Sequence, residues 1–233
     1  MSRFKFYGDG IPDVDLSSLT GKLIVIEGPD YVGRSTQAAL LKEWLESSGH
    51  AVADTGLSRS ALAQKGLEQA KSGHILGRKT MSLFYATDFA DRMEQQIIPA
   101  LRAGYYVLSD RYFYSSCTRD IVRGADPDWL KGVYGFALVP DLVLYLRVEY
   151  TELIPRALYG KGFNYWESGM DMALGEDLFE SFCVYQQRVI KELDKMAEEY
   201  NFKIIDASRN PFVILEDLKD LIRPLLNQVD DAL

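Results

Sequence analysis

The residues of this sequence with the clearest chemical meaning form a glycine-rich segment that could bind phosphate. Gly28 and Gly33 have the spacing of the loop pattern G-x-x-x-x-G-K-[ST], and Ser35 and Thr36 complete it. Arg34 stands where the pattern has lysine. In such a loop, consecutive main-chain N–H groups surround an anion, and the following helix adds the positive end of its dipole. The segment therefore predicts a site for the phosphates of ATP.

Two side chains of this loop are expected to have different roles. A guanidinium keeps its charge and binds phosphate through paired hydrogen bonds, so we expect Arg34 to reach the β- and γ-phosphates. It is planar and bulkier than a lysine ammonium, so the exchange is not neutral. The Ser35 hydroxyl is expected to bind Mg²⁺. The whole predicted phosphate site comprises Gly28, Pro29, Asp30, Tyr31, Val32, Gly33, Arg34, Ser35 and Thr36.

The rest of the chain alternates between strand and helix patterns. Continuous apolar runs predict strands over 23–26, 50–53, 105–109, 140–147 and 202–205. Apolar residues at helical spacing predict helices over 36–46, 60–71, 79–103, 151–158, 177–200 and 211–227, with further helical material to about 137. This alternation predicts an α/β fold: a doubly wound parallel sheet of about five strands, flanked by helices.

One domain accounts for most of the chain. The 233 residues, 47% of them hydrophobic, suffice for one sizeable core. No repeat or linker interrupts residues 21–227, which we take as a single domain. Residues 1–20 form an N-terminal arm, either ordered against the domain or loose, and residues 228–233 form a C-terminal tail.

Composition argues against several classes of protein. The net charge is −8 and the 26 Lys and Arg residues are scattered, which disfavours nucleic-acid binding. No apolar run reaches the length of a membrane span, and the polar N-terminus does not resemble a signal peptide. Cys117 and Cys183 lack metal-site spacing and suit free thiols in a reducing compartment. We expect a cytoplasmic protein that binds neither nucleic acid nor membrane.

Charged residues follow two of the predicted strands. In open parallel sheets, ligands bind at the carboxyl ends of the strands. Asp30 and Arg34 follow the first strand, and Asp110 and Arg111 follow the strand 105–109. Asp110 lies where a carboxylate could hold Mg²⁺ directly or through water, and Arg111 could bind an acceptor phosphate. The alternative is that Asp110 and Arg111 cap the strand and form a surface pair.

Several segments, in this order along the chain, resemble the thymidylate kinase family of nucleoside monophosphate kinases. They are residues 26–37, 83–88, 98–104, 107–116, 140–146 and 205–208. The resemblance implies a P-loop kinase fold with a lid at about 159–175. It implies an ATP- and Mg²⁺-dependent transferase of nucleotide biosynthesis that phosphorylates a nucleoside monophosphate, with dTMP as the best single acceptor. It also implies a homodimer, usually formed through the long helices.

The resemblance implies roles for individual residues as well. Asp30, Arg34 and Arg111 would be catalytic: Arg34 on the donor phosphates, Arg111 on the acceptor phosphate, and Asp30 helping to place the acceptor. The residues expected around the acceptor nucleotide are Phe84, Tyr85, Asp88, Arg111, Ser115 and Ser116, with Phe84 or Tyr85 stacking on the base. Ala207 and Ser208 would lie beside the adenine of ATP.

The chain departs from the family in its basic residues. Family members have lysine at the position of Arg34 and commonly supply a catalytic arginine from the loop or the lid. Here the lid has Lys161 as its only basic residue, with Arg156 at its threshold. Because a missing arginine finger costs on the order of 10³-fold in rate or more, Arg34 would have to offset part of that loss.

The residues expected to recognise the base also differ from the family pattern. The family arginine that reads the thymine carbonyl follows an Ala-Asp-like pair, whereas here Asp88 is followed by Phe89 and Arg92 comes one turn later. A carboxylate such as Asp88 could instead accept a hydrogen bond from an exocyclic amine.

Two other functions stay open at this point. One is a kinase for a deoxynucleoside or another small phosphate, in which Glu27 or Asp30 would act as base on a hydroxyl. Arg111 favours an acceptor that already carries phosphate. The other is a catalytically weakened regulatory protein that binds nucleotide, in which Arg34 and the arginine-poor lid reflect lost catalysis.

Overall fold

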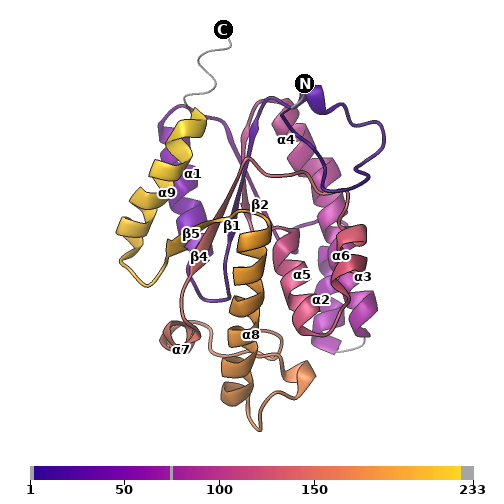
Figure 1. Ribbon diagram of the computed structural model, residues 1–233, viewed down its shortest axis with the longest axis vertical. Coiled ribbons are helices and arrows are strands. Elements are labelled where there is room, and N and C mark those ends of the chain that lie inside the picture. Colours follow the sequence, from indigo (N-terminus) through magenta and orange to yellow (C-terminus); the bar gives the residue numbers. More distant parts are fainter. Residues whose placement is uncertain (1–2, 74–75, 227–233) are drawn as a thin grey trace.

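Five parallel strands form the centre of the molecule (Figure 1). The computed structural model describes residues 3–73 and 76–226. The strands are β1 (Lys22–Glu27), β2 (Val52–Gly56), β3 (Tyr106–Asp110), β4 (Leu142–Arg147) and β5 (Lys203–Asp206). Their order is β2-β3-β1-β4-β5, and each neighbouring pair is parallel. The predicted doubly wound α/β sheet is confirmed.

Helices cover both faces of this sheet. They are α1 (Arg34–Ser47), α2 (Gln64–Gly73), α3 (Arg78–Arg92), α4 (Ile98–Arg102), α5 (Phe113–Val122), α6 (Pro127–Val133), α7 (Tyr150–Tyr159), α8 (Leu178–Glu199) and α9 (Pro211–Leu226). In Figure 1, α1 and α9 pack together on one side and α2 to α6 lie on the other. Helix α8 packs against α5 and α7. Within the described residues, no helix is both long enough and apolar enough to cross a membrane.

The strands are buried on both faces, and this explains their continuous apolar sequences. Along β1, Leu23 and Val25 enter a core shared with α3, α5 and α8. Ile24 and Ile26 point to the opposite core, which α1, α9 and α7 help to form. Successive side chains of a strand alternate between faces, so one short apolar run supplies both cores.

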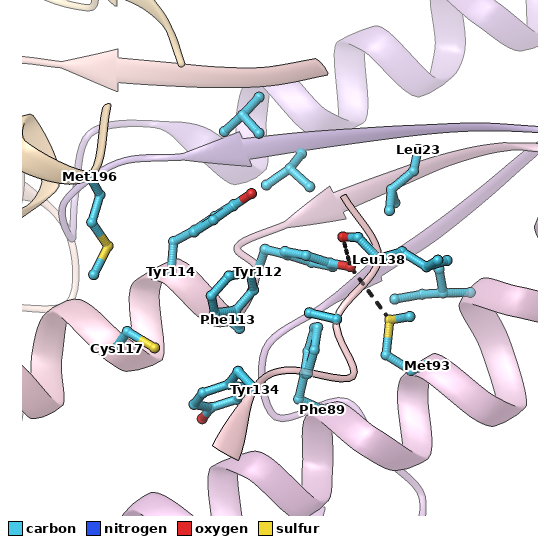
Figure 2. Packing of buried hydrophobic residues seen from close by; sticks show 14 of the residues in the cluster. Leu23, Phe89, Met93, Tyr112, Phe113, Tyr114, Cys117, Tyr134, Leu138 and Met196 are labelled. Carbon is cyan, nitrogen blue, oxygen red and sulfur yellow. Dashed lines mark hydrogen bonds between the residues drawn. The ribbon is translucent and has the colours of Figure 1, made fainter. Parts of the chain in front are cut away.

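Aromatic side chains dominate the first of these cores (Figure 2). Phe89 meets Tyr112 edge-on, with ring centroids 4.8 Å apart, and the Tyr112 hydroxyl donates to the Leu138 carbonyl at 2.9 Å. The arm preceding β1 packs here as well: Phe4 is buried, and the Tyr7 and Tyr114 hydroxyls are 2.6 Å apart. The described part of the arm therefore packs against the domain. The expected tail 228–233 and the helix end at residue 227 lie outside the described residues.

The long helix predicted over 79–103 is not continuous. Helix α3 ends at Arg92, a π-helical turn follows over Met93–Ile97, and α4 begins at Ile98. Pro99 lacks the N–H that a regular helix would donate, which favours a change of hydrogen-bond pattern just before it. Elsewhere, β2 and α2 begin two and four residues later than predicted.

Asp88 lies inside this helical layer and has no exposed surface. Its carboxylate accepts from Nε of Arg92 at 3.0 Å and from the N–H groups of Ser58 and Ser60 at 3.0 and 2.9 Å. Arg92 is equally buried, and neither of its Nη atoms has a hydrogen-bond partner in the described residues. Asp88 thus holds the chain after β2 against α3.

Replacing Asp88 with alanine should destabilise the protein by about 3–5 kcal/mol, because the Arg92 charge would remain buried without its partner. The free energy of unfolding in urea measures this effect. Glu94→Gln, at an exposed position just after α3, is the control and should change it by less than about 0.5 kcal/mol. Equal unfolding free energies for Asp88→Ala and the wild type would contradict the structural role.

Candidate active site

The turn between β1 and α1 has the backbone of an anion-binding loop. Gly28, Tyr31 and Gly33 have positive φ values of 153°, 63° and 100°. Gly33 is the N-cap of α1 and has no side chain with which to cap it. Within the described residues, the N–H groups of residues 31–36 donate to no protein acceptor. These N–H groups at a helix N-terminus form a cradle of the kind that binds phosphate.

The loop requires glycine at its first position, Gly28, because there is no space for a side chain there. A Cβ atom on Gly28 would lie 2.7 Å from the Leu146 carbonyl oxygen and 2.9 Å from Cγ1 of Val32. Any side chain would therefore push the loop off the end of β4. Tyr31 has a left-handed conformation that non-glycine residues seldom adopt, and such strain is common at functional sites.

Arg34 folds back into the loop and is 8% exposed. Its Nη1 donates to the carbonyl oxygens of Gly28, at 2.6 Å, and of Pro29. Its Nε donates to Oδ1 of Asp110 at 3.0 Å. The guanidinium thus joins the loop to the end of β3. Arg34 and Asp110, which the sequence placed after two predicted strands, are thus in contact.

Ser35 and Asp110 also lie together. The Ser35 hydroxyl donates to Oδ2 of Asp110 at 2.6 Å. Burial opposes ionisation of Asp110, but Arg34 and the Ser35 hydrogen bond hold its pKa below the usual value. An ionised carboxylate beside a hydroxyl suits Mg²⁺, which prefers oxygen and takes few ligands from protein. No cluster of three or more metal-binding side chains occurs in the described residues.

Asp30 is the centre of a second charged cluster. Its carboxylate accepts from Nη2 of Arg111 and from Nη2 of Arg119, the latter at 2.8 and 3.0 Å, and Gln186 approaches it at 3.4 Å. Burial opposes ionisation, yet the arginines hold the pKa of Asp30 far below its usual range. Burial, with repulsion from Arg119 and Arg34, lowers the pKa of Arg111 to about 10. Two arginine side chains are therefore held close together.

Arg119 belongs to this site, although the sequence analysis did not select it. The available signal was helical spacing: Ser115 and Arg119 are four residues apart and share one face of α5, and Arg123, its C-cap, follows four residues later. The Arg119 side chain keeps 20% of its surface exposed. In the part of the chain described, only its Nη2 has a hydrogen-bond partner, so Nε and Nη1 remain available.

Glu27 lies behind this cluster and is fully buried. It accepts from the Tyr112 N–H at 2.8 Å and from the Ser115 hydroxyl at 2.6 Å. Ser115 in turn accepts from Nη1 of Arg111 at 3.1 Å. Burial raises the pKa of Glu27. Glu27 and Ser115 therefore orient Arg111, and Glu27 has no surface open to a substrate.

A cavity of about 760 Å³ lies between α2, α3, α5 and the lid. Of the residues expected around an acceptor nucleotide, Tyr85 and Ser116 line it, and Arg119 lines the same space. Phe84, Asp88, Arg111 and Ser115 are absent from its walls. The Phe84 ring lies against Gly66 and borders a separate hollow of about 320 Å³. Asp88 is enclosed as described above, so the structure does not place it near the expected base.

The lid, residues 159–175, lies over the loop and the cavity. The Tyr31 hydroxyl donates to the Gly162 carbonyl at 2.8 Å and also to Glu167. The Trp166 indole donates to the Lys71 carbonyl of α2 at 3.2 Å. Both Arg123 Nε and Nη2 donate to Asp171, at 2.9 and 3.0 Å. The lid thus contacts the phosphate loop and two walls of the cavity.

Arg156 and Lys161 differ in their surroundings. Arg156 donates from Nη1 to the Val32 carbonyl at 3.0 Å and from Nη2 to the Ala207 carbonyl at 2.8 Å. It thereby brings the segment Ala207–Ser208, proposed for adenine, next to the phosphate loop. Ala207 is buried and Ser208 is exposed. Lys161 is exposed and makes no ion pair within the described residues.

Comparison with known proteins agrees with this geometry. A family model described as thymidylate kinase matches residues 26–218. A "Probable thymidylate kinase 2" of Saccharolobus solfataricus is 39% identical over 219 residues, covering 92% of this chain and 100% of the relative. A "Probable thymidylate kinase" of Thermococcus kodakarensis is 32% identical, covering 88% and 98%. A "Thymidylate kinase" of Clavibacter sepedonicus is 45% identical over a shorter 138 residues, 56% of this chain. This chain belongs to the thymidylate kinase family.

Proposed function

We propose that this protein transfers the terminal phosphate of ATP to the phosphate of dTMP, giving dTDP and ADP. The observation that carries the proposal is the cluster at the ends of β1 and β3. There, in the part of the chain that the structure describes, Arg34, Arg111 and Arg119 bond to only two carboxylates, those of Asp30 and Asp110. Buried charges are normally paired, so a cluster with surplus guanidinium is completed by an anionic ligand. It lies between the phosphate loop and the cavity.

The donor side is supplied by main-chain groups. The free N–H groups of residues 31–36 bind the ATP phosphates, and Arg34 adds charge where negative charge develops in the transition state. Ser35 and Asp110 would hold Mg²⁺, which supplies charge neutralisation for the donor phosphates. Ala207 and Ser208 lie beside the adenine. These parts need no movement of the sheet, because β1 and β3 fix them at one edge.

The acceptor side is supplied by Arg111 and Arg119, which bind the dTMP phosphate. The attacking phosphate oxygen is already ionised at neutral pH, since the second pKa of a phosphate monoester is about 6. No general base is therefore needed. Asp30 fits this scheme as the residue that positions the two guanidinium groups. Its carboxylate stays ionised between them and accepts hydrogen bonds from both. Positioning and electrostatic stabilisation account for most of the catalysis of phosphoryl transfer.

The geometry gives little support to a nucleoside kinase. Glu27 is enclosed and Asp30 is a poor base between two arginines. Coupled ADP release with dTMP and with thymidine, each with ATP and Mg²⁺, tests the proposed function. Turnover with dTMP and none with thymidine supports it. ATP binding without turnover on any nucleoside monophosphate would instead favour the regulatory protein.

Arg34 can be tested by two substitutions. Arg34→Ala should lower kcat by on the order of 10³-fold or more, the scale of an arginine finger. Arg34→Lys keeps a charge but not the planar fork that bonds Gly28, Pro29 and Asp110, so we expect an intermediate loss of about 10- to 100-fold. ADP-release kinetics measure both. A lysine variant faster than the wild type would show that Arg34 hinders the reaction.

Arg119 offers a test of the acceptor phosphate site. Arg119→Gln should raise KM for dTMP about 10- to 100-fold, since hydrogen bonds between charged groups contribute about 1.5–3 kcal/mol. KM for ATP should be nearly unchanged. Arg102→Gln, at an exposed position in α4, is the control. A similar rise in both Michaelis constants would mean that Arg119 supports the whole site rather than the acceptor.

We further propose a homodimer, the assembly that the family resemblance implies. Its support here is an apolar surface on α3 and the segment before α2, where Leu62 and Leu83 are 72% and 47% exposed beside the hollow bordered by Phe84. Light scattering should give twice the chain mass, and Leu83→Lys should shift the measured mass towards that of the monomer.

A cytoplasmic location remains our expectation from composition.

A further inference from the structure

One side chain of the phosphate loop extends out of the loop and contacts the lid. The Tyr31 hydroxyl lies within hydrogen-bonding distance of two lid acceptors, the Gly162 carbonyl at 2.8 Å and the Glu167 carboxylate. Burial and the bond to Glu167 raise the pKa of Tyr31, so its phenol stays protonated and donates. Phosphate binding uses only the main-chain N–H of Tyr31, so its side chain is available for a second role.

The phenol and the phosphate cradle belong to the same short turn. Tyr31 has a φ value of 63°, and its N–H is one of those that donate to no protein acceptor in the described residues. Its ring meets Phe182 of α8 edge-on, with centroids 5.9 Å apart, and Phe182 also contacts Phe163 of the lid at 4.6 Å. A closely packed ring has little freedom to move apart from its backbone. A shift of the loop on binding phosphate is therefore passed to the hydroxyl.

Glu167, the partner of Tyr31, lies between the donor and acceptor sides. Glu167 lines the cavity beside α5. Although burial opposes it, Asp30 and, to a smaller extent, Glu167 raise the pKa of Arg119, which places Glu167 near the acceptor phosphate site. The Glu167 carbonyl accepts from Nε2 of Gln186 at 2.8 Å, and the same nitrogen approaches Asp30 at 3.4 Å. One lid residue is thus joined both to the phosphate loop and to the carboxylate that holds the acceptor arginines.

We infer that the hydrogen bond between Tyr31 and Glu167 links occupation of the phosphate loop to the position of the lid, so that ATP and the acceptor nucleotide bind cooperatively. This inference rests on the proposed function, which identifies the two ligands. The lid contacts both sites: it bonds Tyr31 of the loop, and its Asp171 bonds Arg123 at the end of α5. A ligand shifts the lid only if it binds more tightly with the lid in one position. The side chains of Tyr31 and Glu167 are therefore positioning groups, which act through the lid.

Titration calorimetry with both ligands measures this coupling. With Mg²⁺ present, dTMP is titrated into the wild type and into Tyr31→Phe, with and without a saturating ATP analogue in which NH replaces the oxygen between the β- and γ-phosphates. In the wild type the analogue should raise the affinity for dTMP about 5- to 50-fold, a usual range for coupling between sites. In Tyr31→Phe, which loses only the hydroxyl, the factor should fall to about twofold or less. Equal factors in the two proteins, or no effect of the analogue on the wild type, would overturn the inference.

Variants of Glu167 separate coupling from a general structural effect. Glu167→Ala should lower the coupling factor as far as Tyr31→Phe does, and the double variant should lower it no further, because both changes remove one interaction. Glu167→Gln keeps an oxygen that accepts a hydrogen bond, so it should recover part of the coupling. Tyr159→Phe makes the same change at a lid residue that is 93% exposed and should keep the wild-type factor. Losses that add in the double variant, or a glutamine variant no better than alanine, would contradict the link.

Limited proteolysis tests the link between loop and lid without any acceptor. Trypsin cleaves after lysine, and Lys161 is an exposed residue of the lid. Cleavage within a folded chain follows how often the segment opens. The analogue should slow cleavage after Lys161 about fivefold or more in the wild type and in Tyr159→Phe, but less than about twofold in Tyr31→Phe. Equal protection of Tyr31→Phe and the wild type would sink the inference.

These measurements separate the inference from the proposed function. If the wild type shows no ADP release with dTMP, the proposed function fails, while protection of Lys161 by the analogue still tests the link between loop and lid. If the wild type turns over dTMP but Tyr31→Phe keeps both the coupling and the protection, only the role of Tyr31 fails. Turnover of dTMP together with the loss of both effects in Tyr31→Phe supports both.

Discussion

The arrangement of the site depends on one buried carboxylate shared between two arginines. Asp30 at the end of β1 accepts from Arg111 after β3 and from Arg119 in α5, and Gln186 of α8 approaches the same group. Charges taken out of water are tolerated only where partners compensate them. Because those partners come from three other elements, this one group fixes the distance between the phosphate loop and the wall of the cavity.

A second shared carboxylate repeats this arrangement on the donor side. Asp110 accepts from Arg34 and from Ser35, so the first turn of α1 is held to the end of β3. Arg34 also bonds the carbonyl groups of its own loop. A guanidinium has several donors in a rigid plane and can make all these contacts together, whereas an ammonium is a point charge. The arginine therefore shapes the loop in addition to carrying charge.

Most of the fold could be predicted from sequence, and the site only in part. Continuous apolar runs located the strands, because strands of a parallel sheet are buried on both faces and their sequences do not alternate between apolar and polar residues. Arg34 and Asp110 could be selected from sequence because each lies near the carboxyl end of a predicted strand, where ligands bind in open parallel sheets; their roles stay predictions. Arg119 was missed because its partner, Asp30, is 89 residues away along the chain. Nothing local to α5 indicates that pairing.

The burial of Asp88 shows why a motif alone did not locate the base site. Asp88 lies on α3, which packs against α5. Whether its carboxylate faces the cavity depends on the rotation of α3 about its axis, and that rotation is set by core packing. In α3, Phe89 packs against Tyr112 in the core, and Asp88 accepts from the N–H groups of Ser58 and Ser60, where it is enclosed. This rotation depends on contacts between segments that lie far apart in the sequence, so the motif alone could not give it.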